Sequence, residues 1–266
     1  MQEICFDLKA EYQELTVLAG SLSPQQWQLR SDFYGWTPWD EIAHLCYFDE
    51  TALQSVTDAD RFTRGALALS SRIARDEEIS AIARAAYRDL DGPALLAHWR
   101  QRHEPLVEAL VRMDPKARLC WYGPQMSARS FAAARLMETW AHGQDIWDVV
   151  RRKRPATARL KHIAHIGVMT FAWSFVNRGL EVPPVVPGIE LAAPDGGTWT
   201  WGVPSASDFV RGTAEDFCLL VTQRRHLDDT SLRYSAGAAQ QWLSMAQCFA
   251  GPPANGPGPG VRKVQY

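Results

Sequence analysis

Apolar residues in the first half of the chain recur at intervals of three and four, the period of a helix that buries one face. The first such stretch covers residues 4–19, and similar stretches cover 37–56, 91–113 and 130–152. Amphipathic helices joined by connections of moderate length pack as an up-and-down bundle, because each must bury its apolar stripe against the others. The sequence therefore predicts a helical bundle over residues 1–154.

The pattern changes after Pro155. A helix is expected over residues 160–180, and residues 187–202 form two alternating runs around an Asp-Gly-Gly turn, which is typical of a hairpin. Two further strands and two shorter helices are expected after it. The mixture predicts a small α+β domain over residues 155–252 and an α+β class for the whole chain. The segment 253–266 is rich in glycine and proline, which predicts a disordered tail.

Composition narrows the classes of function. The 266 residues carry a net charge of only -2, which argues against a nucleic-acid-binding protein, and the one dense basic run, 151–154, is expected to be a solvated helix end. The five cysteines have no paired spacing and are expected to be reduced thiols. No stretch resembles an export signal or a membrane span. These features predict a soluble cytoplasmic protein whose partner is a small molecule.

Two segments far apart in the sequence carry metal-binding side chains. Glu138 and His142 lie four residues apart, so a helix places them one turn apart on the same face. His44 lies beside the apolar stripe of the helix over 37–56 and completes a facial set of three. Three ligands leave coordination positions open for chemistry, and a bound cation makes the burial of such groups tolerable.

Several other residues have two possible roles. Asp40 is expected to cap its helix, with support of His44 as the alternative. Asp145 either orients a ligand or faces solvent. In the loop before residue 130, Trp121 and Tyr122 are expected to form a wall or lid above the metal. Trp36, Trp140 and Trp147 are expected to be core residues, with the lining of a pocket as the alternative. The remaining histidine and thiol candidates are expected to be structural or surface groups: His98, His103, His162, His165 and Cys46.

The segments 35–45 (GWTPWDEIAHL) and 135–145 (RLMETWAHGQD) resemble the N-terminal bundle of the mycothiol-dependent maleylpyruvate isomerase family, a branch of the DinB-like metal proteins. The segments 210–225 and 241–253 resemble that family's C-terminal domain, a small fold akin to sterol carrier proteins. The resemblance extends from about Asp7 to Pro253. It implies a DinB-like four-helix bundle followed by a sterol-carrier-like α+β domain.

The resemblance also implies a site. It implies a divalent metal, zinc in the first instance, held by His44, Glu138 and His142, with open positions for water or the sulfur of a small thiol such as mycothiol. It further implies that an arginine of the C-terminal domain reaches the cleft between the domains, and the alignment places that arginine at Arg224, with Arg225 as the near alternative. A thiolate that adds to an unsaturated carbonyl compound leads either to cis-trans isomerisation or to S-transfer.

Other functions remain open at this point. The same centre suits a thiol-independent reaction in which the metal acts as a Lewis acid, as in a hydrolase, hydratase or cyclase. The second domain also suits a carrier of a small apolar ligand, with no catalysis. Two imidazoles and a carboxylate accept iron(II) or nickel as well as zinc. The substrate, the use of a thiol and the oligomeric state are not specified by these residues.

Overall fold

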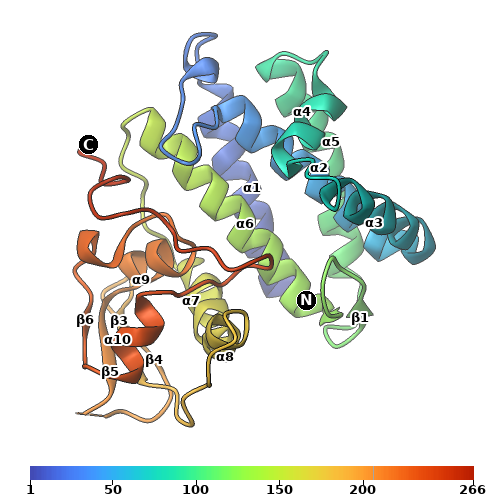
Figure 1. The fold of residues 1–266 in the computed structure, drawn as a ribbon. Helices are drawn as coiled ribbons and strands as arrows, with labels where there is room; N and C mark the ends of the chain where they lie inside the picture. The colour runs from blue at the N-terminus through green and yellow to red at the C-terminus, as the bar shows by residue number, and fades with distance from the viewer. Residues whose placement is uncertain (206) are drawn as a thin grey trace. The chain divides into compact units, whose positions relative to one another are not determined.

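The structure, a computed structural model, describes residues 1–205 and 207–266. The chain divides into two compact units, Met1–Arg152 and Lys153–Tyr266 (Figure 1). The first is mostly helical and the second combines helices with a small sheet, so the predicted α+β class is confirmed. Among the described helices, none is both long and apolar enough to traverse a bilayer.

Four long helices build the first unit, in which every residue is described: α1 (Gln2–Gly20), α2 (Pro38–Thr57), α5 (Gly92–Val111) and α6 (Ala128–Val149). Helices α1 and α2 each pack against both α5 and α6. The connections contain shorter elements: η1 (Gln26–Gln28), α3 (Ala59–Ile73), α4 (Ile79–Tyr87), β1 (Arg118–Leu119) and β2 (Met126–Ser127). The four long helices coincide with the four stretches in which the sequence shows helical periodicity.

The start of α2 is fixed by a capping box. The Asp40 amide donates to Thr37 Oγ1 at 3.3 Å, and the Thr37 amide donates to Asp40 Oδ2 at 2.8 Å. Arg84 Nε also donates to Asp40 Oδ1 at 2.6 Å. Burial raises the pKa of Asp40, but the hydrogen bonds from Arg84 and Thr37 outweigh it and lower the pKa overall. Asp40 therefore caps the helix, as its position in the sequence predicts.

A single buried carboxylate connects the four long helices. Asp49 on α2 is fully buried and accepts hydrogen bonds from Tyr12 Oη of α1, Trp99 Nε1 of α5 and Arg135 Nε of α6, each at 2.8 Å. Burial lowers the pKa of Arg135, but the charge of Asp49 outweighs it and keeps the guanidinium protonated. The core of the bundle is therefore held by an ion pair whose acceptor oxygens are both used.

The second unit contains a four-stranded sheet in the order β4-β3-β5-β6. Strand β3 (Gly188–Ala192) pairs antiparallel with β4 (Thr198–Trp201) in the predicted hairpin and parallel with β5 (Phe209–Thr213), and β6 (Arg233–Tyr234) pairs antiparallel with β5. The helices are α7 (Leu160–Met169), α8 (Phe171–Val176), α9 (Ala214–Val221) and α10 (Ala238–Leu243), with η2 (Leu227–Asp229). The predicted helix over 160–180 is thus two helices that meet at Thr170.

The C-terminal segment 253–266 differs from the expected disordered tail. It contains no helix or strand, but Arg262 Nη1 donates to Gln223 O at 2.8 Å and the Gly260 amide donates to Asp229 Oδ2 at 2.8 Å. Arg262 is 7 % exposed. Glycine and proline prevent regular secondary structure, but they do not prevent side chains and backbone groups from making specific contacts with the second unit.

We expect Asp49→Asn to lower the free energy of unfolding by about 3–5 kcal/mol, because it leaves the buried Arg135 charge without a counter-charge. Urea denaturation of the full chain, followed by far-UV circular dichroism, measures the change. Asp89→Asn is the matched control, because the Asp89 side chain is 92 % exposed and its loss changes stability by no more than about 0.5 kcal/mol. A loss for Asp49→Asn as small as the control's would contradict the role of the ion pair.

His103 predicts a pH dependence of stability. Its ring stacks on Tyr12 with centroids 4.2 Å apart, and burial lowers its pKa to about 4. In the unfolded chain His103 binds a proton at about pH 6.5, whereas in the native chain it stays neutral until the pH approaches 4. The free energy of unfolding therefore decreases as the pH falls, by about 2 kcal/mol between pH 7 and pH 5. His103→Phe keeps the stacked ring and should remove that part of the slope in urea titrations at both pH values. An unchanged slope would show that His103 titrates normally.

Candidate metal centre

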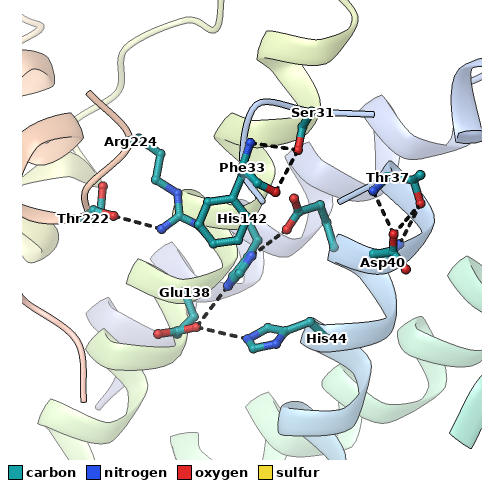
Figure 2. A network of polar contacts seen from close by, with 10 residues as sticks. Ser31, Phe33, Thr37, Asp40, His44, Glu138, His142, Thr222 and Arg224 are labelled. Atoms are coloured by element: carbon teal, nitrogen blue, oxygen red, sulfur yellow. Dashed lines mark hydrogen bonds and ion pairs between the residues drawn. The ribbon is translucent and has the colours of Figure 1, made fainter. Parts of the chain in front are cut away.

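The three predicted ligands come together on the facing sides of α2 and α6. Nε2 of His44 lies 3.6 Å from Glu138 Oε2, and Nε2 of His142 lies 3.4 Å from the same oxygen (Figure 2). One ligand atom from each residue lies within 4.8 Å of the other two. The spacing of four residues on α6 therefore brings Glu138 and His142 to the same place as His44, which comes from 94 residues earlier in the chain.

A fourth residue, Glu41, fixes the orientation of His142. Oε2 of Glu41 lies 2.7 Å from Nδ1 of His142, and the Glu41 residue is 1 % exposed. A carboxylate accepts a hydrogen bond, so the hydrogen is assigned to Nδ1 of His142, and Nε2 is the ring nitrogen that faces Glu138. Glu41 lies in the first turn of α2, where the helix dipole favours a negative charge. Its position three residues before His44 is the only local signal for it, and sequence reasoning missed it.

Asp145 belongs to the same neighbourhood. It is 3 % exposed, and a carboxylate oxygen of Asp145 lies within 4.8 Å of ligand atoms of Glu41 and His142. The alternative of a solvent-facing charge was therefore wrong. Asp145 lies three residues after His142 on α6, so the helix presents both towards α2. Two buried carboxylates, Glu41 and Asp145, therefore lie close to the His142 ring.

Aromatic rings surround the imidazoles. The Trp36 ring lies 5.4 Å from that of His44 and 5.8 Å from that of His142, and the Phe33 ring lies 5.6 Å from that of His142. The Phe48 ring lies 4.7 Å from that of His44. Nδ1 of His44 is buried and has no hydrogen-bond partner among the described residues. Ring contacts with Trp36 and Phe48, together with the approach of Nε2 to Glu138, therefore hold His44 in place.

The turn that carries Phe33 and Trp36 is closed by hydrogen bonds within itself. The Ser31 amide donates to the Trp36 carbonyl at 2.8 Å, and the Trp36 amide donates to the Phe33 carbonyl at 2.9 Å. Gly35 has φ +70°, a conformation that glycine adopts without strain. The chain thus folds back directly before the cap of α2, which places two aromatic rings over the imidazoles.

The loop between β1 and β2 reaches the site through Phe48. Tyr122 and Trp121 lie 5.5 Å and 6.3 Å from the Phe48 ring, and Trp121 also contacts Phe62 and Phe131. Burial raises the pKa of Tyr122 to about 12, so its hydroxyl is neutral near pH 7. These rings lie one layer away from His44. A role for the loop as a lid stays a prediction.

The electrostatics of Glu138 favour its charged form. Burial raises its pKa, but the neighbouring imidazoles of His142 and His44 outweigh burial and lower the pKa well below the ordinary value. The Glu138 side chain retains 25 % of its exposure, and that of His44 retains 13 %. Glu138 is therefore ionised, and the centre is partly accessible to solvent.

A second group, formed by Cys46, Glu50 and His98, also brings three candidate ligand atoms within 4.8 Å of one another. Burial raises the pKa of Cys46 to about 12, which disfavours a thiolate. Arg102 Nε donates to Glu50 Oε1 at 3.1 Å and lies 3.4 Å from His98 Nε2. A guanidinium therefore already compensates the Glu50 charge, and the group is better explained as an ion-pair network.

The other histidines expected to be structural take no part in the centre. The His103 ring is stacked in the bundle core, and His165 Nδ1 accepts a hydrogen bond from Trp201 Nε1 at 3.3 Å in the second unit. Trp140 is 4 % exposed and belongs to the core. Arg152 covers the ring of Trp147 at 5.4 Å.

Arg224 and Arg225 lie in the turn that ends α9 in the second unit. Both amides donate to the Leu219 carbonyl, at 2.7 Å and 3.1 Å. Arg224 Nη1 donates to the Thr222 carbonyl at 2.9 Å (Figure 2). Arg225 Nη1 donates to the Arg224 carbonyl at 2.9 Å. The role that the resemblance implies for Arg224 stays a prediction.

Comparisons with known proteins identify a matching family and similar full-length relatives. Residues 8–147 match the family model described as the mycothiol maleylpyruvate isomerase N-terminal domain. Two uncharacterized proteins from two strains of Mycobacterium tuberculosis are each 42% identical over 251 residues, 94% of this chain and 96% of the relative.

Among solved structures, the chain is similar in fold to a crystal structure of the mycothiol-dependent maleylpyruvate isomerase. The TM-score is 0.52 at 15% identity, over 82% of this chain and 87% of that chain. A histidine-to-alanine mutant of that isomerase gives the same TM-score, 0.52, at 14% identity and the same coverage. Both neighbours are isomerases.

Proposed function

Because the chain belongs to the family of the mycothiol maleylpyruvate isomerase N-terminal domain, we propose that it is a divalent-metal enzyme that uses a small thiol of the mycothiol class to isomerise an unsaturated carbonyl compound. The observation that carries this proposal is the convergence of His44, Glu138 and His142 within 4.8 Å. Two imidazole nitrogens and one carboxylate oxygen are a donor set that suits zinc and leaves coordination positions open.

The arrangement of the three donor atoms suits a bound cation. Nδ1 of His142 donates to Glu41 Oε2, so Nε2 is the ring nitrogen that faces Glu138 Oε2, 3.4 Å away. His44 Nε2 faces the same oxygen at 3.6 Å. Neutral imidazole lone pairs that face a carboxylate repel it, so either a proton or a metal ion must lie between each Nε2 and Glu138. One divalent ion would satisfy the three donor atoms together.

Zinc held by these donors would lower the pKa of a coordinated thiol, which makes a thiolate available near neutral pH. The thiol supplies a sulfur that adds to the double bond of the substrate and leaves again, so that rotation about the intervening single bond interconverts the cis and trans forms without net consumption of thiol. This reaction needs an accessible centre. The partly exposed side chains of Glu138 and His44 provide that access.

The surrounding residues have separate tasks. Glu41 holds the His142 ring and increases the basicity of its Nε2. Trp36, Phe33 and Phe48 exclude water from the other sides of the imidazoles and leave one open side for thiol and substrate. For Arg224 we propose a grip on the carboxylate or enolate oxygens of the substrate, because a guanidinium holds two oxygens at once.

We expect His142→Ala to abolish tight zinc binding and Glu41→Gln to weaken it about 10–100-fold, because the amide no longer accepts the ring proton in the same way. Competition with a chromogenic zinc chelator measures both affinities in the full chain. Glu50→Gln is the matched control on the same helix, and it should leave the affinity unchanged. Zinc binding that is lost in Glu50→Gln and retained in His142→Ala would instead place the ion at the Cys46 group.

We expect the zinc-loaded protein to convert maleylpyruvate to its trans isomer only when mycothiol is present, as followed by ultraviolet absorption and chromatography of the product.

In the same assay, Arg224→Lys should lower kcat/KM about 10–100-fold, because a bidentate charged hydrogen bond is lost. Turnover that persists after small thiols are removed would favour a Lewis-acid enzyme. Sulfur retained in the product would favour S-transfer over isomerisation.

A further inference from the structure

The segment 253–266, called here the C-terminal strap, holds the turn that carries Arg224. Gln223 Nε2 donates to the Ala254 carbonyl of the strap at 2.6 Å and to the Ala246 carbonyl at 3.1 Å. From the other end of the strap, Arg262 Nη1 donates to the Gln223 carbonyl at 2.8 Å. The strap therefore binds both the side chain and the backbone of the residue directly before Arg224.

Gln223 needs this support because its backbone has φ +59°. A non-glycine residue in the left-handed region costs free energy and persists only where the surrounding structure enforces it. The Gln223 residue is 7 % exposed, so its amide and carbonyl must find partners inside the protein. Two of these partners, Ala254 and Arg262, belong to the strap.

The strap is itself anchored. The Ala254 amide donates to Gln247 Oε1 at 3.0 Å. Gln247 Nε2 in turn donates at 3.2 Å to the carbonyl of Pro252, the residue directly before the strap. Arg178 Nη2 donates to the Ala254 carbonyl. The space left where Asn255, Gly256 and Pro257 meet the turn is only about 20 Å³, room for a single water molecule.

The end of the strap meets the neighbouring arginine. Arg225 Nη2 donates to Tyr266 Oη at 3.2 Å, and the Gly260 amide donates to Asp229 Oδ2 at 2.8 Å, a few residues beyond the turn. Contacts thus occur at the start, middle and end of the segment. A tail that only covered an apolar surface would not place a buried guanidinium on one carbonyl of a strained turn.

We propose that the C-terminal strap is part of the site machinery of the second unit, and that Arg262 is a positioning residue that fixes the 222–225 turn and thereby directs the Arg224 guanidinium. This inference rests on the proposed role of Arg224. Its geometric part, the fixation of the turn by Arg262, does not depend on which substrate the enzyme takes.

The first test compares Arg262→Met with Lys263→Met, an adjacent exposed cation of the same segment. Hydrogen exchange of the full chain, resolved to the peptide 219–226, should show amide exchange at least about tenfold faster in Arg262→Met, because Gln223 loses a charged hydrogen bond. Lys263→Met should exchange like the wild type. Equal exchange in both variants would overturn the proposal.

The second test is a double-mutant cycle on kcat/KM with maleylpyruvate and mycothiol. If Arg262 acts through Arg224, Arg262→Met lowers kcat/KM on its own but has no further effect in an Arg224→Met background. Additive losses, or a loss that follows only a lower melting temperature, would overturn the positioning role. If Arg224→Met leaves turnover intact, the proposed role of Arg224 fails, whereas the exchange result still decides whether the strap fixes the turn.

Discussion

The buried ion pair between Asp49 and Arg135 is the interaction on which the bundle and its candidate metal centre depend. The Asp49 carboxylate lies on α2 five residues after His44, and its partner Arg135 lies on α6 three residues before Glu138. A shift of α2 relative to α6 would therefore break a buried ion pair and separate His44 from Glu138 together. Because Tyr12 and Trp99 donate to the same carboxylate, α1 and α5 are tied to the same register. Stability and ligand geometry thus have a common origin.

The centre also shows why buried acids accumulate around His142. A helix that faces its neighbour can present one side chain per turn, and α6 uses successive turns for Arg135, Glu138, His142 and Asp145. Glu41 adds a further carboxylate from α2. An apolar bundle would not tolerate these charges without compensation. Arg135 compensates Asp49, and a divalent cation held by His44, Glu138 and His142 would compensate the charge of Glu138.

Local patterns in the sequence predict the helices, the capping box of α2 and the shared face of Glu138 and His142, because each depends on residues within one or two turns. Glu41 and the Asp49–Arg135 pair escaped prediction because their partners lie 101 and 86 residues away, and no local spacing marks such a pair. The strap escaped for a different reason. Its glycine and proline content predicts the absence of helix and strand correctly, but composition carries no information on whether Arg262 finds a buried carbonyl.

The candidate metal ligands and Arg224 are supported by different comparisons. The family model matches residues 8–147, which contain all three candidate ligands, whereas the similarity to the Mycobacterium tuberculosis relatives extends over 94% of the chain. The proposed metal chemistry therefore rests on the helical unit, which supplies the three donor atoms. Selection of a substrate requires groups directed at the substrate's own charges. In the second unit, the proposed group of this kind is Arg224, which follows the strained Gln223 that the strap holds. Function in such folds resides in the geometry of these few residues rather than in the architecture.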